Sequence, residues 1–229
     1  MPPLAIEIIL FALAATVGYL LGSLNFAVIW SKLIYHDDIR NHGSGNAGTT
    51  NMLRTYGKKA AALTLLGDLL KGVIAALAFG LFFKFVGEGQ NIGFLTYVKG
   101  ATVAGLFAIF GHNWPVFFNF KGGKGVLTSF AVILTVIPIQ GLICLAVFII
   151  VVLITKYVSL GSVLGAAALP VVTIISVVKE GFKADPDGIF LLIFAAISSI
   201  LVIIRHRENI KRIFKGTENK LSFGKKTEK

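Results

Sequence analysis

Two segments of the chain combine glycine, small polar residues and basic side chains in a pattern that suits phosphate binding. Residues 40–54 hold three glycines between two arginines, and residues 111–125 place a Gly-Gly pair between Lys121 and Lys124, directly before an apolar run. Glycine permits positive φ and close approach, so that successive backbone N–H groups can converge on an anion. A helix that begins at the end of such a loop adds its favourable dipole. Both segments are therefore predicted to be phosphate-binding loops.

The candidate ligands are backbone and side-chain groups of these two segments. In the first segment they are Gly43, Ser44, Gly45, Asn46, Thr50, Asn51 and Arg54, and in the second they are His112, Lys121, Gly122, Gly123, Lys124 and Gly125. Ser44 and Lys124 are also predicted to take part in catalysis. The second segment is not a Walker A loop, because Gly125 follows Lys124, and no nucleotide hydrolysis is predicted. Two other interpretations stay open: a solvated membrane loop for the first segment, and lysines that only orient the chain for the second.

A third basic segment follows the last apolar run. His206, Asn209 and Arg212 are spaced at i, i+3 and i+6, so that a continued helix places them along one side. His206 could serve as a general acid or base, or bind phosphate, and Asn209 and Arg212 are predicted to act beside it. A basic tail next to a membrane can also simply contact anionic lipid. The short turn after Lys156 carries a weaker candidate, Ser159, for which a structural cap is the alternative.

The composition indicates that these loops belong to a membrane protein. The chain of 229 residues is 55% hydrophobic and 14% charged, with a mean hydropathy of +0.82, whereas soluble domains carry about 25% charged residues. The formal net charge of +11 favours anionic lipid or a phosphorylated substrate, and nucleic acid is disfavoured because the charge is scattered over short loops. The single cysteine, Cys144, excludes a disulfide framework, and the four dispersed histidines argue against a metal site.

Apolar runs predict the membrane-spanning helices. They cover roughly residues 4–30, 60–83, 93–111, 126–155, 157–178 and 188–204. A spanning helix needs about 20 residues, but residues 126–155 would form about 45 Å of helix. Pro138, followed by Gln140 and Gly141, predicts a turn that divides this run. The predicted fold is all-α: a polytopic membrane protein with seven transmembrane helices, two of them short and split near Pro138.

Positive charge orients these spans. The first basic residue, Lys32, follows the first apolar run, which predicts that the N-terminus lies outside. With the split near Pro138, most of the 22 Lys and Arg residues, and the C-terminus, fall on the cytoplasmic side; without it, the bias reverses. All three polar segments then share that side. Asp68 and Lys71 lie three residues apart inside a span and are predicted to neutralise one another or to support the loop below.

In this order and spacing, the segments resemble the PlsY family, the bacterial acyl-phosphate:glycerol-3-phosphate acyltransferases. The resemblance covers nearly the whole chain, from Gly22-Ser23 to Glu218. It is carried by residues 43–51 with Arg54, by Gly111-His112 through 120–125, and by residues 206–210 with Arg212, Gly216 and Glu218. It implies a seven-helix membrane fold with a cytoplasmic active site, no metal or other cofactor, and acyl phosphate rather than acyl-CoA or acyl-carrier protein as donor. Asn25 stands where many relatives carry proline.

The function implied by the resemblance is the first step of phospholipid synthesis. Acyl phosphate and glycerol 3-phosphate would give 1-acylglycerol 3-phosphate (lysophosphatidate) and phosphate, with His206, His112 or a substrate phosphate oxygen taking the hydroxyl proton. From the residues alone, a membrane transporter of a phosphorylated solute, or a scaffold protein with lipid-binding loops, also fits.

The expected partners are glycerol 3-phosphate, acyl phosphate and membrane phospholipids, with no nucleic acid. The chain is expected to be a monomer in the bacterial cytoplasmic (inner) membrane. A single domain over residues 1–219 and a disordered basic cytoplasmic tail over residues 220–229 complete the prediction.

Overall fold

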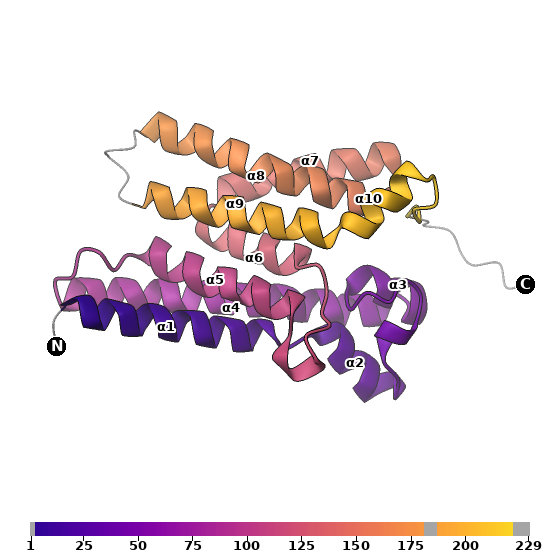
Figure 1. Cartoon of the computed structure of the whole chain (residues 1–229), viewed down its shortest axis with the longest axis horizontal. Coiled ribbons are helices and arrows are strands. Elements are labelled where there is room, and N and C mark those ends of the chain that lie inside the picture. Colours follow the sequence, from indigo (N-terminus) through magenta and orange to yellow (C-terminus); the bar gives the residue numbers. More distant parts are fainter. Residues whose placement is uncertain (1–2, 181–186, 222–229) are drawn as a thin grey trace, which may run out of the picture.

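The chain forms a bundle of helices (Figure 1). The computed structural model describes residues 3–180 and 187–221, and within them every regular element is helical. The α-helices are α1 (Pro3–Gly22), α2 (Phe26–Tyr35), α3 (Thr49–Tyr56), α4 (Lys58–Gly89), α5 (Tyr97–Asn113), α6 (Val126–Val136), α7 (Pro138–Thr155), α8 (Val158–Glu180), α9 (Gly188–Arg205) and α10 (Arg207–Phe214). The 3-10 helices are η1 (Ile39–Asn41) and η2 (Val116–Phe118). The prediction of an all-α fold is confirmed.

The long helices form two groups. Helices α1, α4 and α5 pack together, as do α7, α8 and α9, and α6 lies between the two groups (Figure 1). Helices α1 and α5 approach closely because small residues face each other: a Cβ atom on Gly18 would lie 2.3 Å from the Ala104 carbonyl oxygen, and one on Gly22 would lie 2.1 Å from that of Ala108. Small residues four positions apart allow such backbone contact, which is a common way for helices to associate in a membrane.

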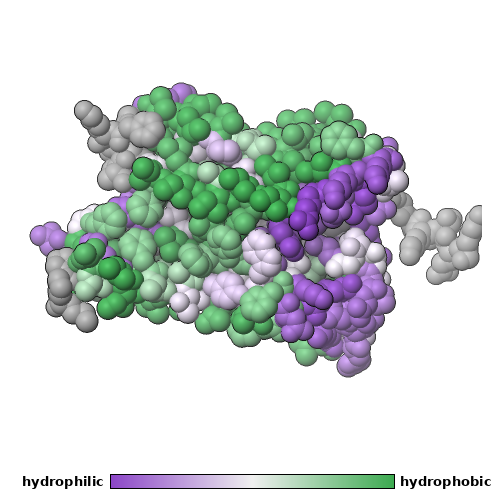
Figure 2. All heavy atoms as spheres, viewed as in Figure 1, coloured by the Kyte–Doolittle hydropathy of each residue, from purple (hydrophilic) through white to green (hydrophobic). Residues whose placement is uncertain are grey.

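In the described part of the chain, six helical segments are long and apolar enough to cross a membrane. Apolar side chains cover most of the bundle surface in Figure 2, and polar residues gather at one end. A membrane core provides no hydrogen-bonding partners, so continuous helices with apolar surfaces are the form expected there. The chain is therefore a multi-pass membrane protein.

The predicted division near Pro138 is present. Helix α6 ends at Val136 and α7 begins at Pro138, which occupies the first helical position, where a missing N–H costs nothing. The turn consists of Ile137 alone, and the Gln140-Gly141 pair expected in it already lies in α7. Helix α6 has 11 residues, about 16 Å, against about 30 Å of hydrocarbon. Length and composition thus support six crossings, and the seventh stays a prediction.

The first apolar run, predicted as one helix, is divided in two. Helix α1 ends at Gly22 and α2 begins at Phe26. Asn25 caps α2, because its Oδ1 accepts a hydrogen bond from the Val28 N–H at 3.1 Å. The Ser23 hydroxyl donates to the Tyr19 carbonyl at 2.8 Å. Two short polar side chains thus satisfy the backbone at the break, and hydropathy averaged over the run does not detect them.

The three predicted chemical segments meet at one end of the bundle, which we call the polar end. It comprises α2, α3, α10 and the loop of residues 114–125, and lies opposite the start of α1 (Figures 1 and 2). Of the predicted tail, the Leu221 N–H donates to the Lys156 carbonyl at 2.7 Å and the Lys220 ammonium lies over the Tyr157 ring. Residues 222–229 lie outside the described residues.

Candidate active site

The first glycine-rich loop is organised by its own asparagine. The Asn51 amide is buried; its Oδ1 accepts from the Ser44 N–H at 3.0 Å, and its Nδ2 lies within hydrogen-bonding distance of the carbonyl oxygens of Ile39, His42 and Asn46. Gly43 and Gly45, flanking Ser44, adopt φ of +57° and +69°, which glycine alone adopts without cost. Asn51 therefore shapes the loop that presents Ser44, and its own polar atoms are already engaged.

The second loop is held by groups outside it. The Gly123 N–H donates to the His112 carbonyl at 3.1 Å. The Arg205 guanidinium, from the end of α9, donates to the Gly123 carbonyl at 2.7 and 3.1 Å and to that of Gly122 at 3.2 Å. The Gly123 N–H is therefore not available to a phosphate, although the loop N–H groups were predicted to converge on one. Gly125, at φ +75°, ends the loop and leads into α6, whose first N–H groups lack helical acceptors.

Arg40 joins the two loops. Its guanidinium pairs with Asp38 at 2.7 Å and donates to the carbonyl oxygens of Phe118 and Lys121 at 2.8 and 3.1 Å. The Lys121 side chain is exposed and lines neither polar cavity described below. Of the two lysines around the glycine pair, only Lys124 is placed as predicted.

The Lys124 ammonium is the cation at the centre of the site. It donates to the Asn209 Oδ1 of α10, so the second and third segments are in direct contact. Burial lowers the pKa of Lys124 to about 8, against the opposing attraction of Glu218, and the nearby Arg212, Arg205 and Arg54 lower it further. A lysine with this pKa is mostly charged at neutral pH and is poorly compensated, a state that a phosphate dianion would relieve.

His206 lies between α9 and α10, with its side chain buried. Its Nδ1 lies 2.7 Å from the Val202 carbonyl oxygen. A carbonyl only accepts, so Nδ1 carries the proton and Nε2 has the free lone pair. Burial and the nearby Lys124 lower the pKa of His206 to about 4. The imidazole is therefore neutral at physiological pH, and it lines the same polar cavity as Lys124.

Glu218 gathers the remaining polar groups. Its Oε1 accepts from the Ser159 hydroxyl at 2.8 Å and from Asn209 Nδ2 at 2.7 Å, and its Oε2 accepts from Arg212 Nε at 2.7 Å. Burial alone would raise the pKa of Glu218, but these three donors lower it overall. The predicted residues Ser159, Asn209 and Arg212 are all hydrogen-bonded to this carboxylate. Through Ser159, the start of α8 is thereby connected to the site.

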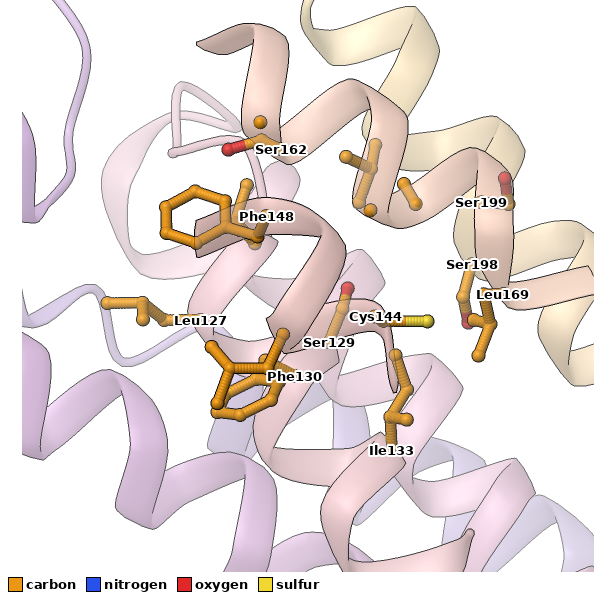
Figure 3. Close-up of a pocket in the computed structure, with 16 residues that line it drawn as sticks. Leu127, Ser129, Phe130, Ile133, Cys144, Phe148, Ser162, Leu169, Ser198 and Ser199 are labelled. Carbon is orange, nitrogen blue, oxygen red and sulfur yellow. The ribbon is translucent and has the colours of Figure 1, made fainter. Parts of the chain in front are cut away.

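Two polar cavities and an apolar one lie next to each other around these groups and share wall residues. A cavity of about 320 Å³ is lined by Ser44, Asn46, Thr50, Asn51, Arg54, His112, Lys124, Gly125, Ser159, His206, Asn209, Arg212 and Glu218, among others. A second, of about 390 Å³, includes Gly45, Gly122 and Arg205 in its wall and shares Ser44, Asn46, Lys124, Asn209 and Arg212 with the first. The third, of about 170 Å³, is almost wholly apolar and lies among α6, α7, α8 and α9 (Figure 3).

The structure brings most predicted site residues together, with three exceptions. Lys121 is exposed, and Gly43 and Gly123 shape the loops without lining a cavity. Arg205 and Glu218 were not among the predicted site residues. Arg205 gave no signal, because an arginine at the end of a span normally orients the helix. Within residues 3–180 and 187–221, no group of three or more His, Cys, Asp or Glu side chains is placed to hold a metal ion.

Comparison with known proteins places this arrangement in one family. The sequence model of the family described as "Glycerol-3-phosphate acyltransferase" matches residues 12–216. Glycerol-3-phosphate acyltransferases of Thermoanaerobacter sp. (strain X514) and Clostridioides difficile (strain 630) are each 45% identical, covering 94% of this chain and 97% of their own length.

The fold matches as well. The crystal structure of PlsY, an integral membrane glycerol 3-phosphate acyltransferase, in its glycerol 3-phosphate form superposes with a TM-score of 0.76 at 35% identity, covering 93% of this chain and 96% of that one. Its lysophosphatidic acid form gives a TM-score of 0.69 at 34% identity. Both the sequence and the fold therefore show that this chain belongs to the glycerol-3-phosphate acyltransferase (PlsY) family.

Proposed function

We propose that this protein transfers an acyl chain from acyl phosphate to glycerol 3-phosphate, giving 1-acylglycerol 3-phosphate and phosphate. One observation carries the proposal: the cationic cavity that Lys124 lines adjoins the apolar pocket of Figure 3. Val126, Leu127, Phe148 and Ser162 line both. An acyl phosphate has the same two parts, an anionic head and an apolar chain. A single molecule can thus have its head in the polar cavity and the start of its chain between the helices.

The proposed reaction needs positioning and charge compensation. The hydroxyl oxygen of glycerol 3-phosphate attacks the carbonyl carbon of acyl phosphate, and the bond from that carbon to the phosphate oxygen breaks. Phosphate leaves with the electron pair, and the hydroxyl proton is transferred to a phosphate oxygen. Lys124, Arg54 and Arg212 all line the cavity, and fixed cations stabilise the charge of both phosphates.

His206 is assigned an orienting role. Its Nε2 has a free lone pair, but Nδ1 donates to a backbone carbonyl rather than to a carboxylate. A carboxylate would stabilise the imidazolium formed by proton transfer; a neutral carbonyl does so less. We therefore assign the proton to a substrate phosphate oxygen. A His206→Gln variant with a kcat within about threefold of wild type would support this assignment, and loss of turnover in a folded variant would make His206 the base.

The two phosphates have two candidate positions. One is beside Ser44, Thr50 and Arg54, and the other is beside Lys124 and the N-terminus of α6. Both assignments of substrate to position fit. The KM values for each substrate in Arg54→Ala and Lys124→Ala variants decide between them, because each variant raises the KM of the phosphate that its cation binds.

The membrane arrangement follows from charge. We place the polar end at the cytoplasmic face of the bacterial cytoplasmic membrane, with the N-terminus outside and α6 and α7 as a pair of crossings. The support is the concentration of Lys and Arg at that end. The residues of the cavity all come from one chain, so a monomer is the proposed active form. A transporter is less well supported, because the polar groups gather at one end rather than at mid-membrane (Figure 2).

The deciding experiment is phosphate release by the purified protein. Palmitoyl phosphate is supplied with and without glycerol 3-phosphate, and palmitoyl-CoA is the alternative donor. We expect release that depends on glycerol 3-phosphate, that requires the acyl phosphate, and that falls about 10- to 150-fold in kcat/KM in Lys124→Ala, the effect of losing a hydrogen bond to a charged group. A folded wild-type chain that releases no phosphate would contradict the proposal.

A further inference from the structure

A buried ion pair and a histidine lie directly beneath the second loop. Asp68 and Lys71 of α4 and His112 of α5 are 1%, 3% and 4% exposed. The Lys71 ammonium lies 2.8 Å from Asp68 Oδ1, 2.9 Å from His112 Nδ1 and 2.9 Å from the Leu24 carbonyl oxygen. The ammonium thus has two hydrogen-bond acceptors and one ion-pair partner. Asp68 and His112 also line the polar cavity, so this cluster reaches the site from below.

The contact with Lys71 determines which ring nitrogen of His112 carries the proton. An ammonium group has three donors and no acceptor. Because Lys71 Nζ lies 2.9 Å from Nδ1, Nδ1 accepts a hydrogen bond and the neutral ring carries its proton on Nε2. Asp68 Oδ1 lies 3.5 Å from the same Nδ1. The carboxylate oxygen and the ring nitrogen therefore lie next to each other, both within reach of the shared ammonium.

The other ring nitrogen is directed at the phosphate loop. A Cβ atom added to Gly123 would lie 2.1 Å from His112 Nε2, so the ring packs directly against this glycine. Within the described part of the chain, Nε2 has no hydrogen-bond acceptor; the contacts of the ring nitrogens are all through Nδ1. Nε2 is not among the fully buried polar atoms that lack a partner, and His112 lines the polar cavity, so this N–H is open to a molecule bound there. In a cavity lined by Lys124 and Arg54, a phosphate oxygen is the acceptor that fits.

The ion pair itself is better explained by this role than by stability. A buried ion pair is expensive to desolvate, and apolar residues of similar size often stabilise a protein as well or better. Apolar residues could not donate to Nδ1. Without that donor, the ring is free to move its proton to Nδ1, toward Asp68, and Nε2 would then turn a lone pair toward the phosphate. This change of tautomer would turn the contact between Nε2 and a phosphate oxygen from attractive to repulsive.

We propose that Lys71 is a positioning residue for phosphate binding. It holds His112 as the Nε2–H tautomer, so that the ring donates to a phosphate oxygen in the polar cavity that His112 and Lys124 both line, and Asp68 compensates the Lys71 charge. The inference rests on the proposed acyl transfer, since it assigns a role within that site. Its direct consequence is that Lys71 and His112 act on the KM for one phosphate substrate through one shared contact.

The tautomer is measured by NMR of the full-length protein labelled with ¹⁵N-histidine in lipid nanodiscs. The His112 signals are assigned by their loss in a His112→Gln variant. We expect Nε2 to be protonated in wild type, its signal to shift when glycerol 3-phosphate or inorganic phosphate is added, and the proton to move to Nδ1 in Lys71→Met. A wild-type ring protonated on Nδ1 would overturn the proposal. This measurement needs no turnover, so it tests the Lys71 proposal by itself. Failure of the acyltransferase assignment would instead be shown by a wild-type protein without turnover.

Kinetics supply the second test. Lys71→Met and His112→Gln should each raise the KM for one phosphate substrate about 10-fold or more, the effect of losing one charged hydrogen bond, with kcat changed less than about threefold. The double variant should be no worse than the worse single variant, because both remove the same contact. Additive effects, or an unchanged KM in Lys71→Met, would contradict the proposal.

Two further variants guard against a merely structural effect. Lys71→Met leaves the Asp68 charge buried alone, so Asp68→Asn/Lys71→Met removes both charges and should fold while keeping the raised KM. The matched control is Lys99→Met, which removes another lysine that is 3% exposed, hydrogen-bonded to the Phe94 carbonyl at 3.0 Å, at the end of the bundle away from the site. Its KM values should stay at wild-type levels. A similar rise in KM in Lys99→Met would show that removing any buried lysine has this effect.

Discussion

The two glycine-rich loops resemble one another in sequence and are held in opposite ways. The first is folded by its own Asn51, whose amide lies within hydrogen-bonding distance of four backbone groups between residues 39 and 46. The second is held by Arg205 and Arg40, which lie far from it in the sequence, and by the His112 carbonyl near its start. The first loop is therefore a local structure, whereas the second takes its shape only when α5 and α9 are assembled. A glycine-rich pattern indicates the capacity to bind phosphate, and the surrounding contacts determine what the loop depends on.

The largest expected effect comes from breaking the first loop from within. Asn51→Asp keeps the size of the side chain but replaces its N–H donors by a carboxylate oxygen facing the carbonyl groups of Ile39, His42 and Asn46. We expect a loss of about 2–4 kcal/mol in the free energy of unfolding and loss of turnover. Thermal unfolding of the detergent-solubilised protein and phosphate release measure the two effects.

The control for this variant is Asn91→Asp. Asn91 is exposed and lies just after α4, at the opposite end of the bundle. The same chemical change there should alter neither stability nor turnover. If Asn51→Asp behaved like Asn91→Asp, the first loop would not depend on its asparagine, and the contrast between the loops would be lost.

The second loop should be sensitive to the geometry of Arg205 rather than to its charge alone. A lysine keeps the charge but cannot reach the carbonyl groups of Gly122 and Gly123 with a planar fork. We expect Arg205→Lys to lower kcat/KM about 10- to 150-fold, the effect of one lost charged hydrogen bond, and Arg205→Gln to lower it further. Wild-type kinetics in Arg205→Lys would mean that charge alone acts here. The melting temperature should change less than in Asn51→Asp, because no new carboxylate is placed among buried carbonyl groups.

The local parts of this fold could be predicted from the sequence. Hydropathy placed the long helices to within a few residues, and Pro138 correctly divided the fourth apolar run. The break at residues 23–25 was missed, because Ser23 and Asn25 act there through two specific hydrogen bonds that do not change the average hydropathy of residues 4–30. A capping asparagine before an apolar segment was the available signal.

The candidate site, like the fold, was predictable where its residues are close in sequence and not where they are distant. Glycines and cations close together in sequence identified both loops, whereas contacts between distant residues did not follow from the pattern. Arg205 and Gly123 are 82 positions apart, and an arginine at a helix end is as typical of membrane orientation as of a loop clamp. Lys121 and Lys124 could not be told apart, since only the path of the loop directs one outward and the other into the cavity.

The pH dependence tests the cation of the second loop. The pKa of Lys124 is about 8, so the ammonium is charged below that value and loses its charge as the pH rises through it. Because kcat/KM reports the free enzyme, we expect it to fall above about pH 8. Lys124→Arg should remove this decline, because a guanidinium keeps its charge. With a pKa of about 4, His206 stays neutral over the measured range and contributes no change near neutral pH. An alkaline decline that persists in Lys124→Arg would assign it to another group.

The smallest effect on kcat/KM is expected from substituting Lys121. Comparing it with Lys124 shows whether the position of a lysine in the second loop matters, since both carry the same charge. Lys121 and Lys124 flank the same two glycines, but the Lys121 side chain is exposed and only its backbone carbonyl is used, by Arg40. Lys121→Ala keeps that carbonyl and should change kcat/KM less than about twofold at 0.15 M salt, where exposed charges are largely screened. Lys124→Ala, three residues away, is the matched comparison. A loss at Lys121 that disappears at high salt would show that it attracts the substrate from a distance. A loss that persists at high salt would place its ammonium in contact with phosphate, and the second loop would then bind with both of its lysines.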